Sequence, residues 1–202
     1  MGARSGSGGE GGGRGDSSYK GSISNVESLK NIQDPKLYKA MKEAISRYHS
    51  ALGIPQRKVK LADLDWAYGV HVTTAEGKSE GVYLNKALYK TGTVKSITKS
   101  KASDYTSGWA TQTNKPVAHT ITHELAHATW NSHLSGANQK AAGKEIKAMY
   151  KSWSSDKRKS GYGKYSKTNV NEFWAETVTK AIHGKSDKYT KQVKNIVKKY
   201  KL

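Results

Sequence analysis

The clearest chemical pattern in the chain is a His-Glu-x-x-His motif formed by His123, Glu124 and His127. We predict a helix from Pro116 to about Trp130, because no Gly or Pro interrupts this segment. Four residues of α-helix turn through about 400°, so the two imidazoles lie on one face and can chelate one zinc ion. Glu124 would then take a proton from a zinc-activated water molecule instead of binding the metal.

A further histidine, His119, lies one turn before His123 on nearly the same helix face. A His119–His123 pair could also bind a metal, but this pairing would leave Glu124 without its role in activating water. We therefore interpret His119 as a structural residue, or as one that supports the metal ligands from behind.

A catalytic zinc ion commonly has three protein ligands, and two parts of the chain could supply the third. His133 has the ligand spacing of the HExxHxxGxxH pattern, but Trp130 stands where that pattern needs a Gly for a sharp turn. The alternative is Glu172 and Glu176, one helical turn apart beside two aromatic residues. Burying these acids is costly unless positive charge lies opposite, and a zinc site would supply that charge. Glu172 would then bind the metal, and Glu176 would hydrogen-bond the imidazole of a ligand, which we expect to be that of His123.

A second motif, Tyr165-Ser-Lys-Thr-Asn-Val-Asn-Glu-Phe-Trp-Ala-Glu176, places Glu172 45 residues after His127. Together the two motifs resemble the gluzincin-type zincin-like metallopeptidases that include the catalytic domain of anthrax lethal factor. These proteins carry a tyrosine seven residues before the metal-binding glutamate. The resemblance covers about residues 117–183 and implies three Zn²⁺ ligands, which are His123, His127 and Glu172.

The same resemblance implies roles for two further residues. Glu124 would be the general base, and Tyr165 would stabilise the oxyanion or protonate the leaving amine. The substrate would be a peptide or protein, but the substrate preference of lethal factor is not implied, because its recognition domains have no counterpart in this chain.

The composition limits the other chemistry that the chain can do. The absence of Cys excludes disulfides, zinc ribbons, iron–sulfur clusters and thiol catalysis, so a metal must be held by His and carboxylates. The chain has 35 Lys and Arg against 16 Asp and Glu, and the resulting net charge of +19 favours acidic partners. Residues 185–202 hold seven Lys and one Asp. They could bind nucleic acid or another polyanion nonspecifically, or form a solvated helix face.

The chain organisation indicates a flexible tail followed by one domain. Eight of the first sixteen residues are Gly, so we expect a tail or linker at 1–17 and a single domain at 18–202.

We find no signal peptide and no apolar run that could span a membrane, and expect a cytoplasmic or virion-associated protein rather than an autonomously secreted one. By analogy, the Gly-rich segment, the basic charge and the motifs resemble small domains of phage head proteins and bacterial toxin-like polypeptides.

The predicted elements give an α+β fold, with a small N-terminal sheet followed by the helices that carry the metal site. We expect a helix from Asp34 to Gly53 and a connection without regular structure at 90–115. The expected strands are Lys58–Ala62, Trp66–Thr74 and Gly81–Leu84, the last two as a hairpin. Later helices are expected at 116–130, 138–153, 170–183 and 189–202. Gly81–Leu84 is the exposed edge that we nominate to pair with a peptide.

The sequence thus favours a zinc-dependent endopeptidase that uses a zinc-activated water molecule. The alternative is a basic nucleic-acid-associated protein whose zinc site is structural or vestigial.

Overall fold

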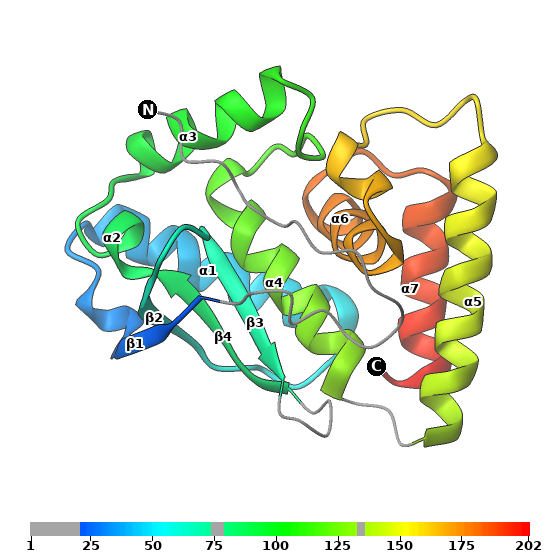
Figure 1. The fold of residues 1–202 in the computed structure, drawn as a ribbon, viewed down its shortest axis with the longest axis horizontal. Coiled ribbons are helices and arrows are strands. Elements are labelled where there is room, and N and C mark those ends of the chain that lie inside the picture. Colours follow the sequence, from blue (N-terminus) through cyan, green and yellow to red (C-terminus); the bar gives the residue numbers. More distant parts are fainter. Residues whose placement is uncertain (1–20, 74–78, 133–135) are drawn as a thin grey trace.

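The computed structural model describes residues 21–73, 79–132 and 136–202, and this part of the chain is a mixed α+β structure, as predicted (Figure 1). Its strands are β1 (Ile23–Ser28), β2 (Val59–Leu64), β3 (Gly69–Thr73) and β4 (Ser79–Asn85). Its α-helices are α1 (Pro35–Leu52), α2 (Lys86–Tyr89), α3 (Val94–Thr106), α4 (Pro116–Ser132), α5 (Gly136–Ser155), α6 (Val170–His183) and α7 (Lys188–Tyr200). Two short 3-10 helices are η1 (Leu29–Asn31) and η2 (Lys164–Lys167). The expected tail at 1–17 lies outside the described residues.

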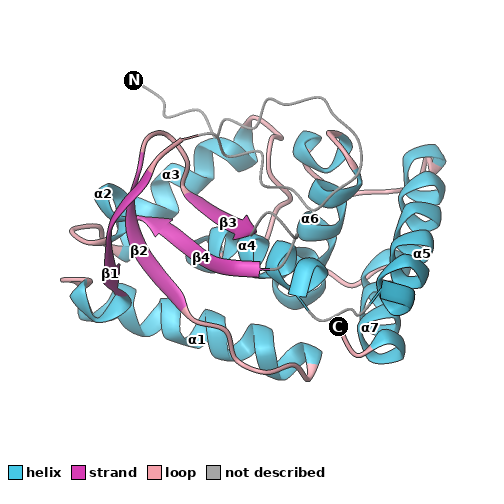
Figure 2. Ribbon diagram, turned by 60° about the horizontal axis from the view of Figure 1, so that its bottom comes forward, coloured by secondary structure: helices cyan, strands magenta, loops and turns pink. Residues whose placement is uncertain are grey.

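The four described strands form one sheet in the order β1-β2-β4-β3, seen in Figure 2. β4 pairs antiparallel with β3, so the predicted hairpin is present, and β4 pairs parallel with β2 on its other side. The prediction that Gly81–Leu84 forms an exposed edge is therefore wrong. Alternation of apolar residues indicates that a segment is a strand but does not show which strands it pairs with. The chain passes from β2 to β3 and then returns as β4 between them, so β4 lies inside the sheet. Among the described strands, β3 is the edge on this side.

The first helix is fixed by its two ends, as its sequence predicts. The Asp34 carboxylate accepts a hydrogen bond from the backbone N–H of Lys36 at 2.8 Å, and Pro35 occupies the first turn. Gly53 ends the helix with φ of 67°, a left-handed conformation that glycine adopts without strain. The fully buried Tyr48 then ties α1 to α4, because its hydroxyl lies 3.0 Å from the backbone oxygen of Leu125.

The prediction of an irregular connection over residues 90–115 is wrong for residues 94–106. Half of this segment is α3, which begins at a capping box between Thr93 and Ser96. Only Ile97 and Lys101 of α3 are buried, so its sequence has little amphipathic pattern to reveal a helix. β1 was also not predicted; its residues are mostly exposed and only its pairing with β2 defines it.

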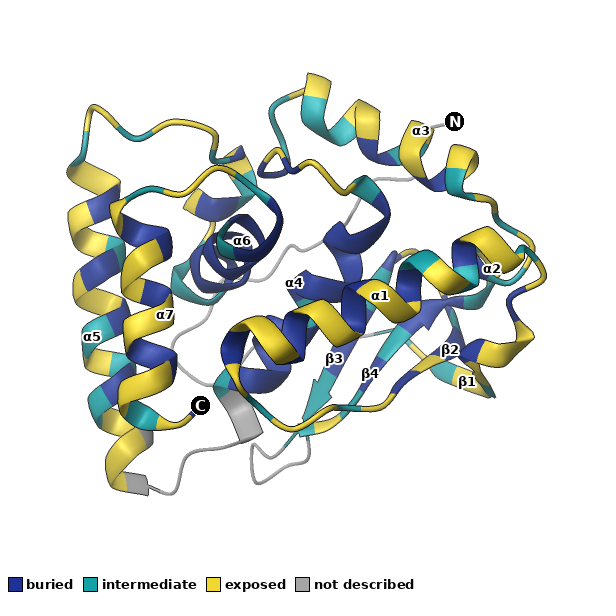
Figure 3. Cartoon of the chain, turned by 180° about the vertical axis from the view of Figure 1, so that it is seen from behind, coloured by how far each residue is buried: buried dark blue, intermediate teal, exposed yellow. Residues whose placement is uncertain are grey.

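Helix α4 occupies the centre of the fold and positions the candidate site. It packs against α1, β3 and β4 on one side and against α6 on the other (Figure 1). Figure 3 shows that α6 is buried on nearly all sides, and every residue from Glu172 to Lys180 is buried. Polar side chains on such a helix must find partners inside the protein. Among the described residues, no helix combines the length and the apolar character needed to cross a membrane.

Candidate metal centre

Three donor atoms from α4 and α6 converge inside the protein. Nε2 of His123 and Nε2 of His127 lie 3.1 Å apart, which follows from their positions one turn apart on α4. Oε2 of Glu172, in the first turn of α6, lies 3.0 Å from His123 Nε2 and 3.5 Å from His127 Nε2. The three residues are at most 6% exposed. The structure thus brings together the three side chains that the sequence nominated as zinc ligands.

The spacing of these atoms fits a tetrahedral metal ion. Zinc ligands at about 2.0–2.1 Å from the ion, with tetrahedral angles, lie roughly 3.3 Å from one another. The buried Oε2 of Glu172 also receives no well-directed hydrogen bond from the described residues, although two imidazole nitrogens are close to it. A carboxylate oxygen that is buried in this way is stabilised by a cation, so these three residues could hold a metal ion.

Glu176 holds the first imidazole from behind. Its Oε1 lies 2.9 Å from Nδ1 of His123, the contact expected from the sequence, and its Oε2 accepts the backbone N–H of Thr111 at 2.6 Å. A proton on Nδ1 of His123 leaves Nε2 unprotonated and directed at Glu172 and His127. This is the tautomer that binds a metal.

His119 lies on the other side of the same carboxylate. Its Nε2 is 3.1 Å from Oε1 of Glu176, and its Nδ1 is 3.3 Å from the hydroxyl of Tyr105. His119, His123 and Glu176 form a second group of potential metal ligands. However, Glu176 already accepts hydrogen bonds through both oxygens in this arrangement, so His119 fits the supporting role expected from the sequence better than a ligand role.

The pKa shifts follow from this dense pairing. Burial lowers the pKa of His123, but its hydrogen bonds with Glu172 and Glu176 outweigh burial and raise the pKa well above its ordinary 6.5. Burial also lowers the pKa of His127, and the charge of Glu172 reverses this effect. Burial raises the pKa values of Glu172 and Glu176, but the neighbouring histidines hold both below the usual range. The carboxylates are therefore ionised, and they attract either protons on the imidazoles or a metal ion.

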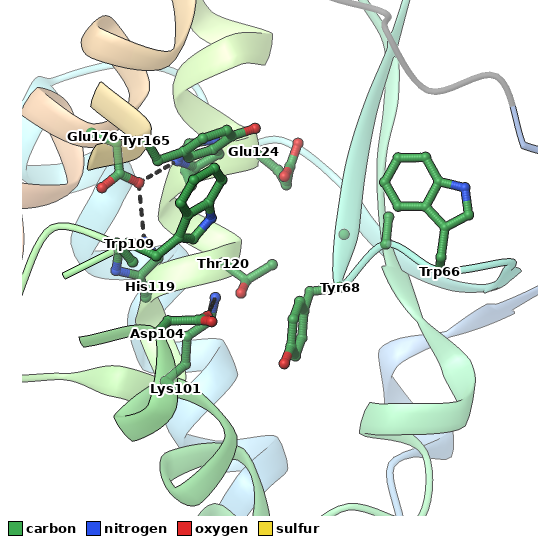
Figure 4. Close-up of a pocket in the computed structure, with 14 residues that line it drawn as sticks. Trp66, Tyr68, Lys101, Asp104, Trp109, His119, Thr120, Glu124, Tyr165 and Glu176 are labelled. Atoms are coloured by element: carbon green, nitrogen blue, oxygen red, sulfur yellow. Dashed lines mark hydrogen bonds and ion pairs between the residues drawn. The ribbon is translucent and has the colours of Figure 1, made fainter. Parts of the chain in front are cut away.

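A cleft opens beside these residues, and Glu124 lines it (Figure 4). The Tyr165 ring extends from η2 toward Glu124 and stacks on His123, with ring centroids 5.5 Å apart. The opposite wall comes from the β2–β3 connection and the start of β3, where Trp66 is 41% exposed. The floor includes Lys101, whose Nζ lies 3.0 Å from Oδ2 of Asp104.

The edge strand β3 lies directly against the face of α4 that carries Thr120 and Glu124. A Cβ added to Gly69 would stand 2.9 Å from Cγ2 of Thr120 and 3.2 Å from Cγ of Glu124. Real Cβ atoms do not approach other atoms as closely as the first of these distances, so glycine is needed for this approach. The sheet edge and the predicted general base are thus neighbours.

Sequence reasoning missed the residues between α3 and α4 that support the site. Thr111 binds Glu176, and Trp109 stacks on Tyr165 with ring centroids 5.4 Å apart. No motif marks these residues; an isolated Trp in a polar segment is the only available signal. His133, the other candidate for third ligand, lies outside the described residues.

Comparisons of the chain with protein-family models, with curated proteins and with solved structures found no match. The assignment of a function therefore depends on the residues themselves.

Proposed function

We propose that this chain is a zinc-dependent endopeptidase. The observation that carries the proposal is the convergence of His123 Nε2, His127 Nε2 and Glu172 Oε2 to within 3.5 Å of one another, beside a cleft that Glu124 lines. Bound at these three atoms, zinc would supply Lewis acidity, which makes a water molecule more acidic and polarises a peptide carbonyl.

Glu124 is the general base in this proposal. It is half-buried at the cleft and belongs to the same helix as the two histidines, so its carboxylate is held near the metal without being one of the three convergent donors. It takes a proton from the attacking water and delivers it to the leaving amine. Tyr165, whose ring is stacked on His123 and extends toward Glu124, donates a hydrogen bond to the carbonyl oxygen as that oxygen gains negative charge.

The edge strand β3 offers a place for the substrate backbone. An extended peptide that adds to β3 as a further strand would form main-chain hydrogen bonds with it and pass along the face where Gly69 approaches Glu124. This replaces the expectation that Gly81–Leu84 would do so. The substrate class supported by this arrangement is an extended segment of peptide or unfolded protein.

The test is metal analysis combined with digestion of a peptide library by wild type, Glu124→Gln and Glu43→Gln. Glu43 is exposed on α1 and serves as the matched control. We expect about one zinc ion per chain in all three proteins, and cleavage that is chelator-sensitive in wild type and in the control. Glu124→Gln should reduce cleavage by roughly 10²–10⁴-fold. Full activity of Glu124→Gln, or a wild type that binds no zinc, would overturn the proposal.

The basic charge supports the second candidate, a nucleic-acid-associated protein. Lys191, Lys194 and Lys198 are exposed on the outer face of α7. Such lysines bind phosphates without sequence preference, with an affinity that falls steeply as salt rises. A mobility-shift titration at two salt concentrations tests this function. A tight, salt-dependent shift in a protein that cleaves no peptide would favour it over the peptidase.

A further inference from the structure

The segment between α3 and α4 makes close main-chain contact with the segment that carries Tyr165. The backbone N–H of Lys164 donates to the carbonyl of Gly108 at 2.8 Å, and that of Tyr165 donates to the carbonyl of Trp109 at 2.9 Å. Gly163 permits this approach, since a Cβ there would lie 2.2 Å from the Trp109 carbonyl oxygen. Main-chain hydrogen bonds alone therefore hold the two segments together.

The side chain of Trp109 adds a second contact with Tyr165. The two rings are stacked, with an interplanar angle of 26°, and the Tyr165 ring also stacks on His123 at 18°. Tyr165 is thus stacked with both an indole and the imidazole of a candidate metal ligand. Trp109 and Tyr165 both stand at the wall of the cleft near Glu124 (Figure 4).

The same segment also reaches the carboxylate behind His123. The backbone N–H of Thr111 donates to Glu176, and its hydroxyl accepts the backbone N–H of Gly163 at 3.1 Å. The Thr111 hydroxyl also lies 3.2 Å from Oγ of Ser166, next to Tyr165. One short stretch of chain therefore contacts both Tyr165 and Glu176, the two groups that lie against the His123 ring.

We propose that Trp109 is a positioning residue, whose indole holds the Tyr165 ring against His123 so that the tyrosine hydroxyl keeps a fixed place beside Glu124. This inference rests on the proposed peptidase function for its consequence in catalysis. Tyr165 is half-buried at the wall of the cleft, and the stacked indole of Trp109 lies against its ring. A hydroxyl that leaves its place contributes little to the reaction, since catalysis depends on groups held in the reactive geometry.

A double-mutant cycle tests the catalytic consequence. Trp109→Ala should lower kcat by about tenfold and change KM by less than about threefold, whereas Trp109→Phe, which retains a ring, should stay within about threefold of wild type. In a Tyr165→Phe background, Trp109→Ala should cost almost nothing more, because the group that it positions is already absent. The inference fails if Trp109→Ala costs the same factor in both backgrounds, or if Trp109→Phe is as impaired as Trp109→Ala.

Zinc content separates this effect from loss of the metal site. Each of these variants should bind as much zinc as wild type, since neither Trp109 nor Tyr165 offers one of the three convergent donor atoms. If Trp109→Ala loses zinc, then the residue supports the fold of the site as a whole, and the specific inference is wrong.

A readout that needs neither metal nor activity keeps the two proposals distinguishable. In chelator-treated protein, the ring signals of Tyr165, assigned by comparison with Tyr165→Phe, should be shifted upfield in the NMR spectrum by the stacked indole. Trp109→Ala should abolish most of this shift, and Trp66→Ala, on the opposite wall of the cleft, should leave it unchanged. An unaltered shift in Trp109→Ala would overturn the inference even if wild type cleaves peptides. A lost shift in a protein without activity would support the contact and refute only the proposed function.

Discussion

Nδ1 of His123 lies 2.9 Å from Oε1 of Glu176, and both side chains are buried in the centre of the fold. This contact fixes the tautomer of His123 and directs its Nε2 toward His127 and Glu172. The carboxylate acts on the candidate metal through the imidazole.

Glu176→Gln should weaken zinc binding by about 10–100-fold while leaving a folded protein, because the neutral amide no longer stabilises the His123 N–H. Competition with a chromogenic chelator measures the change. Glu145→Gln, at a partly exposed position on α5, is the control and should bind zinc as wild type does. An unchanged affinity in Glu176→Gln would show that the carboxylate does not tune the ligand.

Glu172→Gln should abolish stoichiometric zinc binding, because it removes the only carboxylate among the three convergent donors. His133→Ala should retain zinc. The opposite pattern, with zinc lost on replacing His133 and kept in Glu172→Gln, would favour the HExxHxxGxxH ligand set. Zinc that is lost in Glu176→Gln and kept in Glu172→Gln would instead indicate the group of His119, His123 and Glu176.

Gly69→Ala should reduce peptidase activity by about tenfold or more without loss of zinc. The new Cβ would stand 2.9 Å from Thr120, 3.0 Å from Leu84 and 3.2 Å from Glu124, so the edge strand or the general base must move. The matched control is Gly143→Ala on α5, where a Cβ meets nothing within 4 Å. That control should keep its activity and gain about 0.5–1 kcal/mol of helix stability. Equal activity of both variants would show that the close approach of β3 to Glu124 is not needed for peptidase activity.

The buried His183 should make the fold less stable in mild acid. Burial, followed by the positive charges of Arg47, His119 and Lys115, lowers the pKa of His183 from 6.5 to about 4. Between these two values the unfolded chain binds a proton that the folded chain does not, so the free energy of unfolding falls as pH drops from 6.5 toward 4. At pH 5 this group contributes about 2 kcal/mol of destabilisation.

His183→Gln should therefore lose less stability than wild type between pH 7.5 and pH 5, by about 2 kcal/mol. Urea unfolding at both pH values, in the presence of a chelator so that metal binding does not contribute, measures the difference. The glutamine retains a group that can hydrogen-bond the hydroxyl of Thr122, which lies 2.9 Å from Nε2 of His183. The same pH dependence in both proteins would contradict the assigned shift.

Much of the fold was predictable where local sequence decides local structure. Asp34, Pro35 and Gly53 mark the ends of α1, and the predicted bounds of α6 agree with the observed Val170–His183. α3 was missed because it buries only two residues and its apolar periodicity is weak. β1 was missed because strands with exposed residues are defined by their partner, which lies more than 30 residues away in the sequence.

The residue types of the candidate site were also determined by the sequence. The spacing of His123 and His127 on a helix requires both imidazoles to share one face, and the pair Glu172 and Glu176 requires the same of two carboxylates. Only the packing of α4 against α6 decided that these two faces meet and which carboxylate reaches which nitrogen. Tertiary structure also decided that β3, and not β4, is the edge strand, and that Trp109 lies against Tyr165. Such contacts join residues distant in the chain, and the local periodicity of a sequence carries no information about its partners across the fold.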